Sequence, residues 1–141
     1  MKKISANPGR VIVLGKQGEN LSRCVLFDVS AWMELYGDGS VQLVHQRKGD
    51  SSPYPCLVTC KNGVARWEIR QTDVAVPGEG MAELQFYQGE TIVKSTTYKT
   101  LTMPSLSQAS AAPSQPEQSW VDAVLQAAAN VVTQVITMGK N

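Results

Sequence analysis

The chain has 141 residues, with 13 Lys and Arg against 12 Asp and Glu and a formal net charge of +1. This length allows one domain with an appendage but not two independent cores. Because the charges are nearly balanced and interspersed, we expect no nucleic-acid partner and no membrane partner. The apolar run at residues 11–14 is too short for a signal peptide, so we expect synthesis and residence in the cytoplasm.

The cysteine and histidine content argues against a disulfide framework and against a metal site. Cys24, Cys56 and Cys60 make an odd count in a chain without an export signal. In an extended segment the Cα atoms of Cys56 and Cys60 would lie about 13 Å apart, too far for a disulfide. His45 is the single histidine. We therefore expect small core or half-buried thiols, no metal and no cofactor.

The first half of the chain predicts short strands around one brief helix. Residues 10–14 and 23–27 have the apolar content of strands, and residues 41–46 alternate in polarity. Between them, Asp28 or Ser30 can cap one or two helical turns that Gly37 would end.

The second half predicts two hairpins. Asn62-Gly63 is the favoured pair for a tight type I′ turn, which indicates a hairpin over residues 55–70 with Trp67 and Ile69 on one face. Residues 81–87 and 91–103 predict another strand pair that turns near Gln88-Gly89. About seven short strands at this spacing predict a mainly β fold, an antiparallel β-sandwich or a small barrel, over residues 1–103.

Beyond the β domain the composition changes. Residues 104–118 are rich in Pro, Ser, Ala and Gln and predict a linker. Ser119 can then cap a helix over residues 119–138, with Asp122 completing a capping-box pattern. The polar face of this helix argues against a membrane span.

The predicted helix carries an apolar stripe that must be buried against protein. We expect it to form a short coiled coil or bundle between copies of the chain, as a dimer or trimer. The alternative is that it folds back onto its own β domain. The expected interface residues are Trp120, Val121, Val124, Leu125, Ala128, Val131, Val132 and Val135.

Candidate chemistry is sparse, and we expect no catalytic residues. His45 lies on a predicted strand, where a side chain on the strand face explains it without catalysis. Asp73, Glu79 and Glu83 could be paired carboxylates, but a solvated loop explains them equally well. The glycines at 78 and 80 precede a strand, which favours a turn or a close backbone approach over a phosphate loop. Tyr54 and Tyr87 are the candidates for an exposed ligand or partner surface.

Several sequence segments resemble a family of phage proteins. In the first half these are LGKQGEN (14–20), FDVSAW (27–32), VHQRKGD (44–50) and PYP (53–55). In the second half they are Trp67, TDVA (72–75), GEG (78–80), AEL (82–84), VKS (93–95) and QSWVD (118–122). Over about residues 10–138 the order of these segments resembles that in tail and baseplate structural proteins of phages and prophages of Gram-positive hosts.

This resemblance implies an upper-baseplate-type N-terminal β-sandwich that docks onto other tail or baseplate proteins, followed by a helix that joins the copies. We therefore expect a non-enzymatic virion protein, a tail, baseplate or fibre attachment component, with itself and other phage proteins as partners. A carbohydrate-binding module for host surface glycans is an alternative from another class. A head decoration or fibre protein is a third possibility that shares the same physics.

Overall fold

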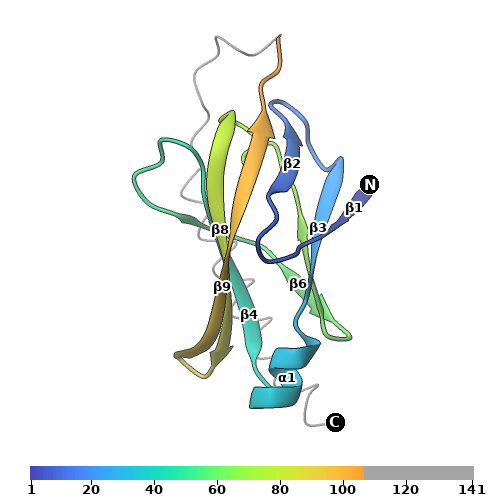
Figure 1. The fold of residues 1–141 in the computed structure, drawn as a ribbon, viewed down its shortest axis with the longest axis vertical. Coiled ribbons are helices and arrows are strands. Elements are labelled where there is room, and N and C mark those ends of the chain that lie inside the picture. Colours follow the sequence, from blue (N-terminus) through green and yellow to red (C-terminus); the bar gives the residue numbers. More distant parts are fainter. Residues whose placement is uncertain (107–141) are drawn as a thin grey trace.

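The computed structural model describes residues 1–106, which form two β-sheets and one short helix (Figure 1). One sheet has the strand order β1 (Lys2–Ser5), β3 (Arg23–Asp28), β7 (Val64–Glu68), β6 (Thr59–Lys61). The other has the order β2 (Ile12–Lys16), β9 (Thr91–Met103), β8 (Gly78–Gln88), β4 (Ser40–Gln46), β5 (Tyr54–Cys56). The helix α1 spans Ser30–Tyr36 and lies at one end of the molecule.

The expectation of a mainly β fold is confirmed, but that of an antiparallel sandwich is right only in part. Two strand pairs, β1 with β3 and β2 with β9, are parallel, so both sheets are mixed. β1 was not expected, because its Lys-Lys-Ile-Ser sequence has one apolar residue and little β pattern. Its position on the edge of the sheet requires only that Ile4 contact the core.

The core lies between the two sheets and is built from the alternate, inward-facing residues of their strands. Its largest fully buried side chains include Trp67, Phe27 and Phe86. The ring of Phe27 contacts that of Tyr98 edge-on at 5.3 Å, which joins β3 of one sheet to β9 of the other. Trp67 and Ile69 are both buried, as their shared face predicted, and all three cysteines are buried or half-buried.

Local rules explain the turns and the helix. Asn62 and Gly63 have φ values of 54° and 75°, the left-handed conformations that a type I′ turn requires. The Asp28 carboxylate accepts hydrogen bonds from the backbone N–H and the hydroxyl of Ser30 at 3.0 and 2.6 Å, at the start of α1. Gly37 follows the last helical residue, with its N–H donating to the carbonyl of Met33. The predicted turn and helix end are therefore confirmed. The hairpin is shorter than the expected 55–70: it runs from Thr59 to Glu68, because residues 54–56 pair with β4 in the other sheet.

Gly80 is the third residue of β8, opposite Thr100 of β9 and beside the end of β4. A Cβ atom at this position would collide with the backbone carbonyl oxygen of Gln46 and crowd the hydroxyl of Thr100. A close backbone approach, one of the two explanations offered for the glycines at 78 and 80, is therefore confirmed for Gly80. Gly78 has instead a φ of +115°, and its neighbour is the side chain of Lys48.

The predicted C-terminal helix, residues 119–138, lies outside the described residues, as does most of the linker. Within residues 1–106, no helix has the length and hydropathy to cross a membrane.

We predict that Gly80→Ala lowers the free energy of unfolding by about 3 kcal/mol, because a rigid backbone must move to admit the methyl group. Gly49→Ala is the control: φ there is +86° but its Cβ would meet nothing within 4 Å. The control should cost only about 1 kcal/mol of backbone strain. Urea denaturation measures both. Equal losses would mean that the contact with Gln46 does not limit residue 80.

Candidate functional site

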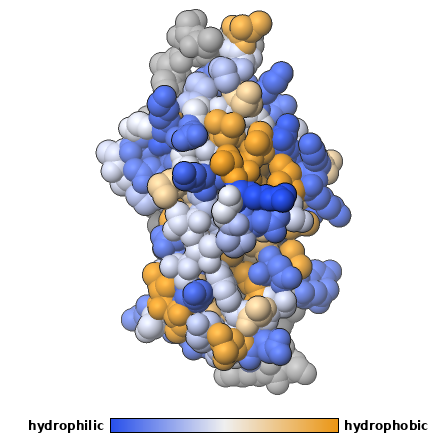
Figure 2. Space-filling view, in the orientation of Figure 1, coloured by the Kyte–Doolittle hydropathy of each residue, from blue (hydrophilic) through white to orange (hydrophobic). Residues whose placement is uncertain are grey.

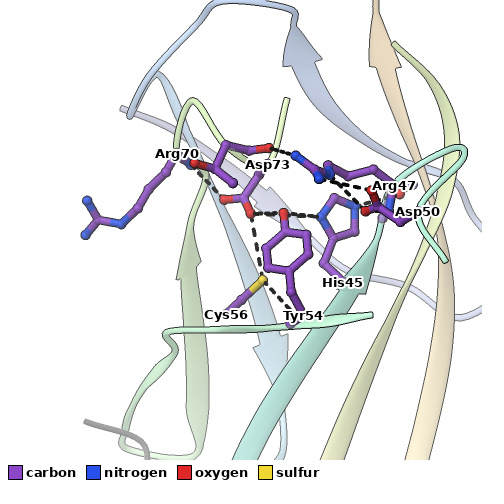
Figure 3. Close-up of polar contacts among 9 residues, drawn as sticks. His45, Arg47, Asp50, Tyr54, Cys56, Arg70 and Asp73 are labelled. Carbon is purple, nitrogen blue, oxygen red and sulfur yellow. Dashed lines mark hydrogen bonds and ion pairs between the residues drawn. The ribbon is translucent and has the colours of Figure 1, made fainter. Parts of the chain in front are cut away.

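A buried polar cluster lies on the inner face of the second sheet, and Figure 3 shows its side chains converging. His45 comes from β4, Tyr54 and Cys56 from β5, Thr100 from β9, and Asp73 from the loop between β7 and β8. His45 is 1% exposed and Asp73 is 2% exposed. Such groups are tolerated in an interior only when hydrogen bonds replace the water that they lose.

A chain of short hydrogen bonds joins the cluster. The hydroxyl of Tyr54 donates to Asp73 Oδ1 at 2.6 Å, and its oxygen lies 2.9 Å from Nδ1 of His45. Nε2 of His45 lies 3.2 Å from the hydroxyl oxygen of Thr100. The second carboxylate oxygen of Asp73 accepts the backbone N–H of Arg70 at 2.8 Å. The loop that carries Asp73 is thereby tied to three strands of the second sheet.

These partners assign the proton on the imidazole. Since the Tyr54 proton points to Asp73, the Tyr54 oxygen acts as acceptor toward His45. Nδ1 of His45 must then carry the proton, which leaves Nε2 to accept the hydroxyl proton of Thr100. In this tautomer both ring nitrogens are hydrogen-bonded to their neighbours in the cluster.

An ion pair lies beside the cluster. The guanidinium of Arg47 donates to both carboxylate oxygens of Asp50, at 2.8 and 3.0 Å, and to the carbonyl of Thr72 at 3.2 Å. The same guanidinium lies over the ring of Tyr54, 5.3 Å from its centroid. Arg47 therefore fastens the 47–50 turn to the loop that carries Asp73.

Burial makes the two candidate nucleophiles of the cluster unreactive. Burial raises the pKa of Tyr54 far above its usual value, and the neighbouring charge of Asp73 adds to the effect. The pKa of the Cys56 thiol is raised by the same two causes. A neutral, enclosed thiol is a poor nucleophile, because the thiolate is the reactive form. The cluster therefore has the chemistry of a structural network.

The metal-binding capacity of the cluster can be tested on its donors. His45, Cys56 and Asp73 each offer one ligand atom, and these atoms lie within 4.8 Å of one another. However, the hydroxyl of Tyr54 is bonded both to Nδ1 of His45 and to Asp73 Oδ1. Nδ1 is bonded to Tyr54 as a donor, and it would have to lose that proton before it could bind zinc. The arrangement fits a hydrogen-bonded cluster better than a metal site.

The structure corrects one of the two surface candidates. Tyr54 is buried, and its hydroxyl points inward to Asp73, so the prediction that it lies at the surface was wrong. The inward face of β5 decides this, because Tyr54 pairs with His45 on β4. Tyr87 is half-buried, and its hydroxyl donates to the side chain of Gln85 at 3.3 Å. The expected interface residues from Trp120 to Val135 lie outside the described residues.

Sequence reasoning missed the roles of Asp73 and Thr100. Asp73 was considered with Glu79 and Glu83 as a loop carboxylate, yet it is buried while Glu79 is exposed. One signal was present, because Asp73 lies three residues after Arg70 and can accept its N–H in a turn. No local pattern connects residue 73 with residues 45, 54 and 100, which only the fold brings together.

The surface of the second sheet carries a shallow hollow. A cavity of about 210 Å³ lies on its outer face, lined by Val44, Gln46, Pro53, Met81, Ala82, Glu83 and Thr97. The titratable group among these residues is Glu83, which contacts Gln85. The hollow therefore offers a contact surface rather than a set of converging catalytic groups.

These observations define residues 1–106 as a two-sheet β protein whose hydrophobic core encloses one hydrogen-bonded polar cluster. No protein-family model matches the sequence, and no curated protein matches it. Among solved structures, the N-terminal domain of phage TP901-1 ORF48 is similar in fold, with a TM-score of 0.48 and 12% sequence identity. The alignment covers 73% of this chain and 99% of that chain.

We predict that Tyr54→Phe lowers the free energy of unfolding by about 2–3 kcal/mol, because His45 and Asp73 each lose a partner in the interior. Tyr87→Phe is the matched control. It removes a hydroxyl from a half-buried surface position and should change stability by no more than about 0.5 kcal/mol. Equal effects of the two substitutions in urea denaturation would contradict the hydrogen-bonded cluster.

The Arg47–Asp50 pair gives a prediction about acid. Burial opposes ionisation of Asp50, but the hydrogen bonds from Arg47 outweigh it and hold the pKa of Asp50 below 3.8. A pKa lowered by folding contributes stability that is present above pH 3.8 and is lost as the pH falls through the folded-state value. Asp50→Asn should therefore cost about 2 kcal/mol near neutral pH.

Below pH 3.8 the difference between this variant and the wild type should shrink. The control is Glu68→Gln, which breaks a solvent-exposed contact with Arg66 at 3.6 Å. It should change stability by less than about 1 kcal/mol at any pH. Urea denaturation between pH 2 and pH 7 measures both, at about one-unit steps. A loss for Asp50→Asn that is constant over this range would contradict the assignment.

Proposed function

We propose that the protein is a non-enzymatic virion component of a phage, a tail, baseplate or fibre attachment protein. Its β domain docks onto other virion proteins, and its C-terminal helix assembles with copies of itself. The proposal is supported by the order of the segments that resemble the phage tail and baseplate family, from residue 14 to residue 122. It is also supported by the mainly β fold that this resemblance implies.

One structural observation carries the non-enzymatic part of the proposal. The acid, base and nucleophile that the described residues bring together, Asp73, His45 and Cys56, are buried and bonded to one another. Substrate cannot reach them without opening the core. The cluster instead holds β4, β5 and β9 to the loop that carries Asp73, which is a structural role.

The proposed mechanism is burial combined with avidity. The apolar stripe of the helix leaves water when copies associate, which drives assembly. Joining several β domains then multiplies contacts that are individually weak, because each further contact is made within one assembly. Docking through the β domain and association through the helix therefore depend on each other.

The carbohydrate-binding alternative has lost part of its basis. It needed two exposed tyrosines, and Tyr54 is buried while Tyr87 is half-buried. A head decoration or fibre protein would use the same domain and the same helix and would differ only in its place in the particle.

We predict that the double substitution Val124→Asp and Val131→Asp reduces the full-length protein from an oligomer to a monomer, because two charges would enter the apolar interface. The control, Asn130→Asp with Thr137→Asp, adds the same charge to the polar face of the predicted helix and should leave the mass unchanged. Light scattering after size exclusion measures the mass. An oligomer that survives the valine substitutions, or a wild type that is already monomeric, would contradict association through the helix.

A further inference from the structure

The outer face of the second sheet carries an exposed apolar patch where β2 joins β9. We define it by Val11 and Val13, at and before the start of β2, and by Leu101 and Met103 on β9. Val13 pairs directly with Leu101. Val11 is 46% exposed and Met103 is 42% exposed, and Figure 2 shows orange surface over these strands with blue surface around it. Elsewhere on this face, the cross-strand row through Gln42, Gln85 and Ser95 is polar.

The sequence of β2 indicates that this patch is normally covered. Residues 11–14 form a continuous run of four apolar side chains, which is typical of a strand buried on both faces. Ile12 and Leu14 face the core and are 2% and 1% exposed. Because side chains alternate along a strand, Val11 and Val13 face outward. Within residues 1–106, Val11 is exposed and Val13 is half-buried, so this face of the apolar strand is only partly covered.

The rim of the patch carries three basic residues and one acidic residue. Arg10, Lys16 and Lys99 are exposed and stand next to the patch residues in sequence or across the strand pair. Glu79 on β8 is exposed as well and pairs with Leu101. A second hollow, of about 330 Å³, adjoins Val11 and is lined also by Gly9, Arg10, Thr97 and Lys99. An apolar occupant with an acidic residue would fit this surface best.

The chain itself supplies such an occupant within reach. β9 ends at Met103, inside the patch, and the described structure ends at Leu106. Residues 107–118 are twelve residues long and span up to about 40 Å when extended. The segment 119–138 can therefore return to the outer face of the strand from which it departs.

The sequence of that segment contains a second apolar row. In a helix, five of the eight residues expected to join copies form one row: Val121, Val124, Ala128, Val131 and Val135. Leu125, Ala129, Val132 and Ile136 follow spacings of four, three and four and form a neighbouring row, to which Leu125 and Val132 of the eight also belong. Asp122, the one charged residue of 119–138, stands three residues before Leu125 at the start of this row.

We propose that the row Leu125, Ala129, Val132 and Ile136 docks onto the patch of its own chain, with Asp122 against Lys16 or Lys99 and away from Glu79. The first row then remains available to other copies. Docking would hold the β domain at a fixed angle to the predicted helix. The inference goes beyond the proposed function, because it holds whether or not the copies associate.

Carbodiimide cross-linking of the wild-type, full-length protein tests the contact without any substitution. We expect Asp122 to be joined to Lys16 or Lys99, and mass spectrometry of the linked peptides identifies the pair. A mixture of unlabelled and ¹⁵N-labelled protein separates the two origins of the link. Links within one isotopic form support docking on the same chain. Links that mix the isotopes, or links of Asp122 to lysines elsewhere, overturn it.

Disulfide trapping is the second measurement, in a Cys60→Ala background because Cys60 is the least buried of the three cysteines. Val13→Cys is combined in turn with Leu125→Cys, Val132→Cys and Asn130→Cys. We expect about tenfold more intrachain disulfide for the first two, since a disulfide needs Cα atoms within about 7 Å and Asn130 lies on another face of the predicted helix. Thr59→Cys with Val132→Cys, on the other sheet, should give the low level of the Asn130 control.

Equal yields at all positions, or only interchain disulfides, would overturn the docking. Light scattering on the same samples keeps the two proposals apart. An intrachain link in a monomer supports docking and contradicts self-association, whereas an oligomer without the link does the reverse.

Discussion

The structure depends on keeping a carboxylate, an imidazole, a phenol and a thiol together in the interior of a small β domain. Removing one partner would leave another without a hydrogen bond, at a cost that is a large share of the stability of a domain of this size. Asp73 lies at the centre of this constraint, because it accepts from Tyr54 and from the backbone of the loop. The strands β4, β5 and β9 and the 70–75 turn are consequently held in one arrangement.

The same network limits what the domain can do. Groups that would form an acid, a base and a nucleophile in an open cleft here satisfy one another, and burial keeps Tyr54 and Cys56 protonated. Interaction with other molecules is therefore left to the outer surface. That surface is uneven: one part of the second sheet is polar, whereas the β2–β9 part is apolar and is bordered by three basic residues and Glu79.

This unevenness follows from the path of the chain. β2 is an edge strand that joins the second sheet only through four residues at the end of β9. Its apolar run places two side chains in the core and two outside, so the core and the outer patch are built by the same short segment. The strand that leads out of the domain ends in this patch. The exposed apolar patch and the start of the C-terminal segment are thus neighbours, which links the folding of the domain to its proposed assembly.

The sequence determined the elements that depend on near neighbours. The Asn62-Gly63 turn, the helix that ends before Gly37, the bounds of β9 and the inward face of Trp67 and Ile69 all follow from turn conformations and from the period of two in a strand. β8 begins at Gly78, three residues before its expected start at Met81. The chain's tertiary structure decided the parallel pairing of β1 with β3 and of β2 with β9, because edge strands need little sequence pattern of their own. It also decided the burial of Tyr54 and Asp73. Their hydrogen bonds join residues 19 positions apart on elements that meet only when the loop closes over β5, and no local spacing encodes such a meeting.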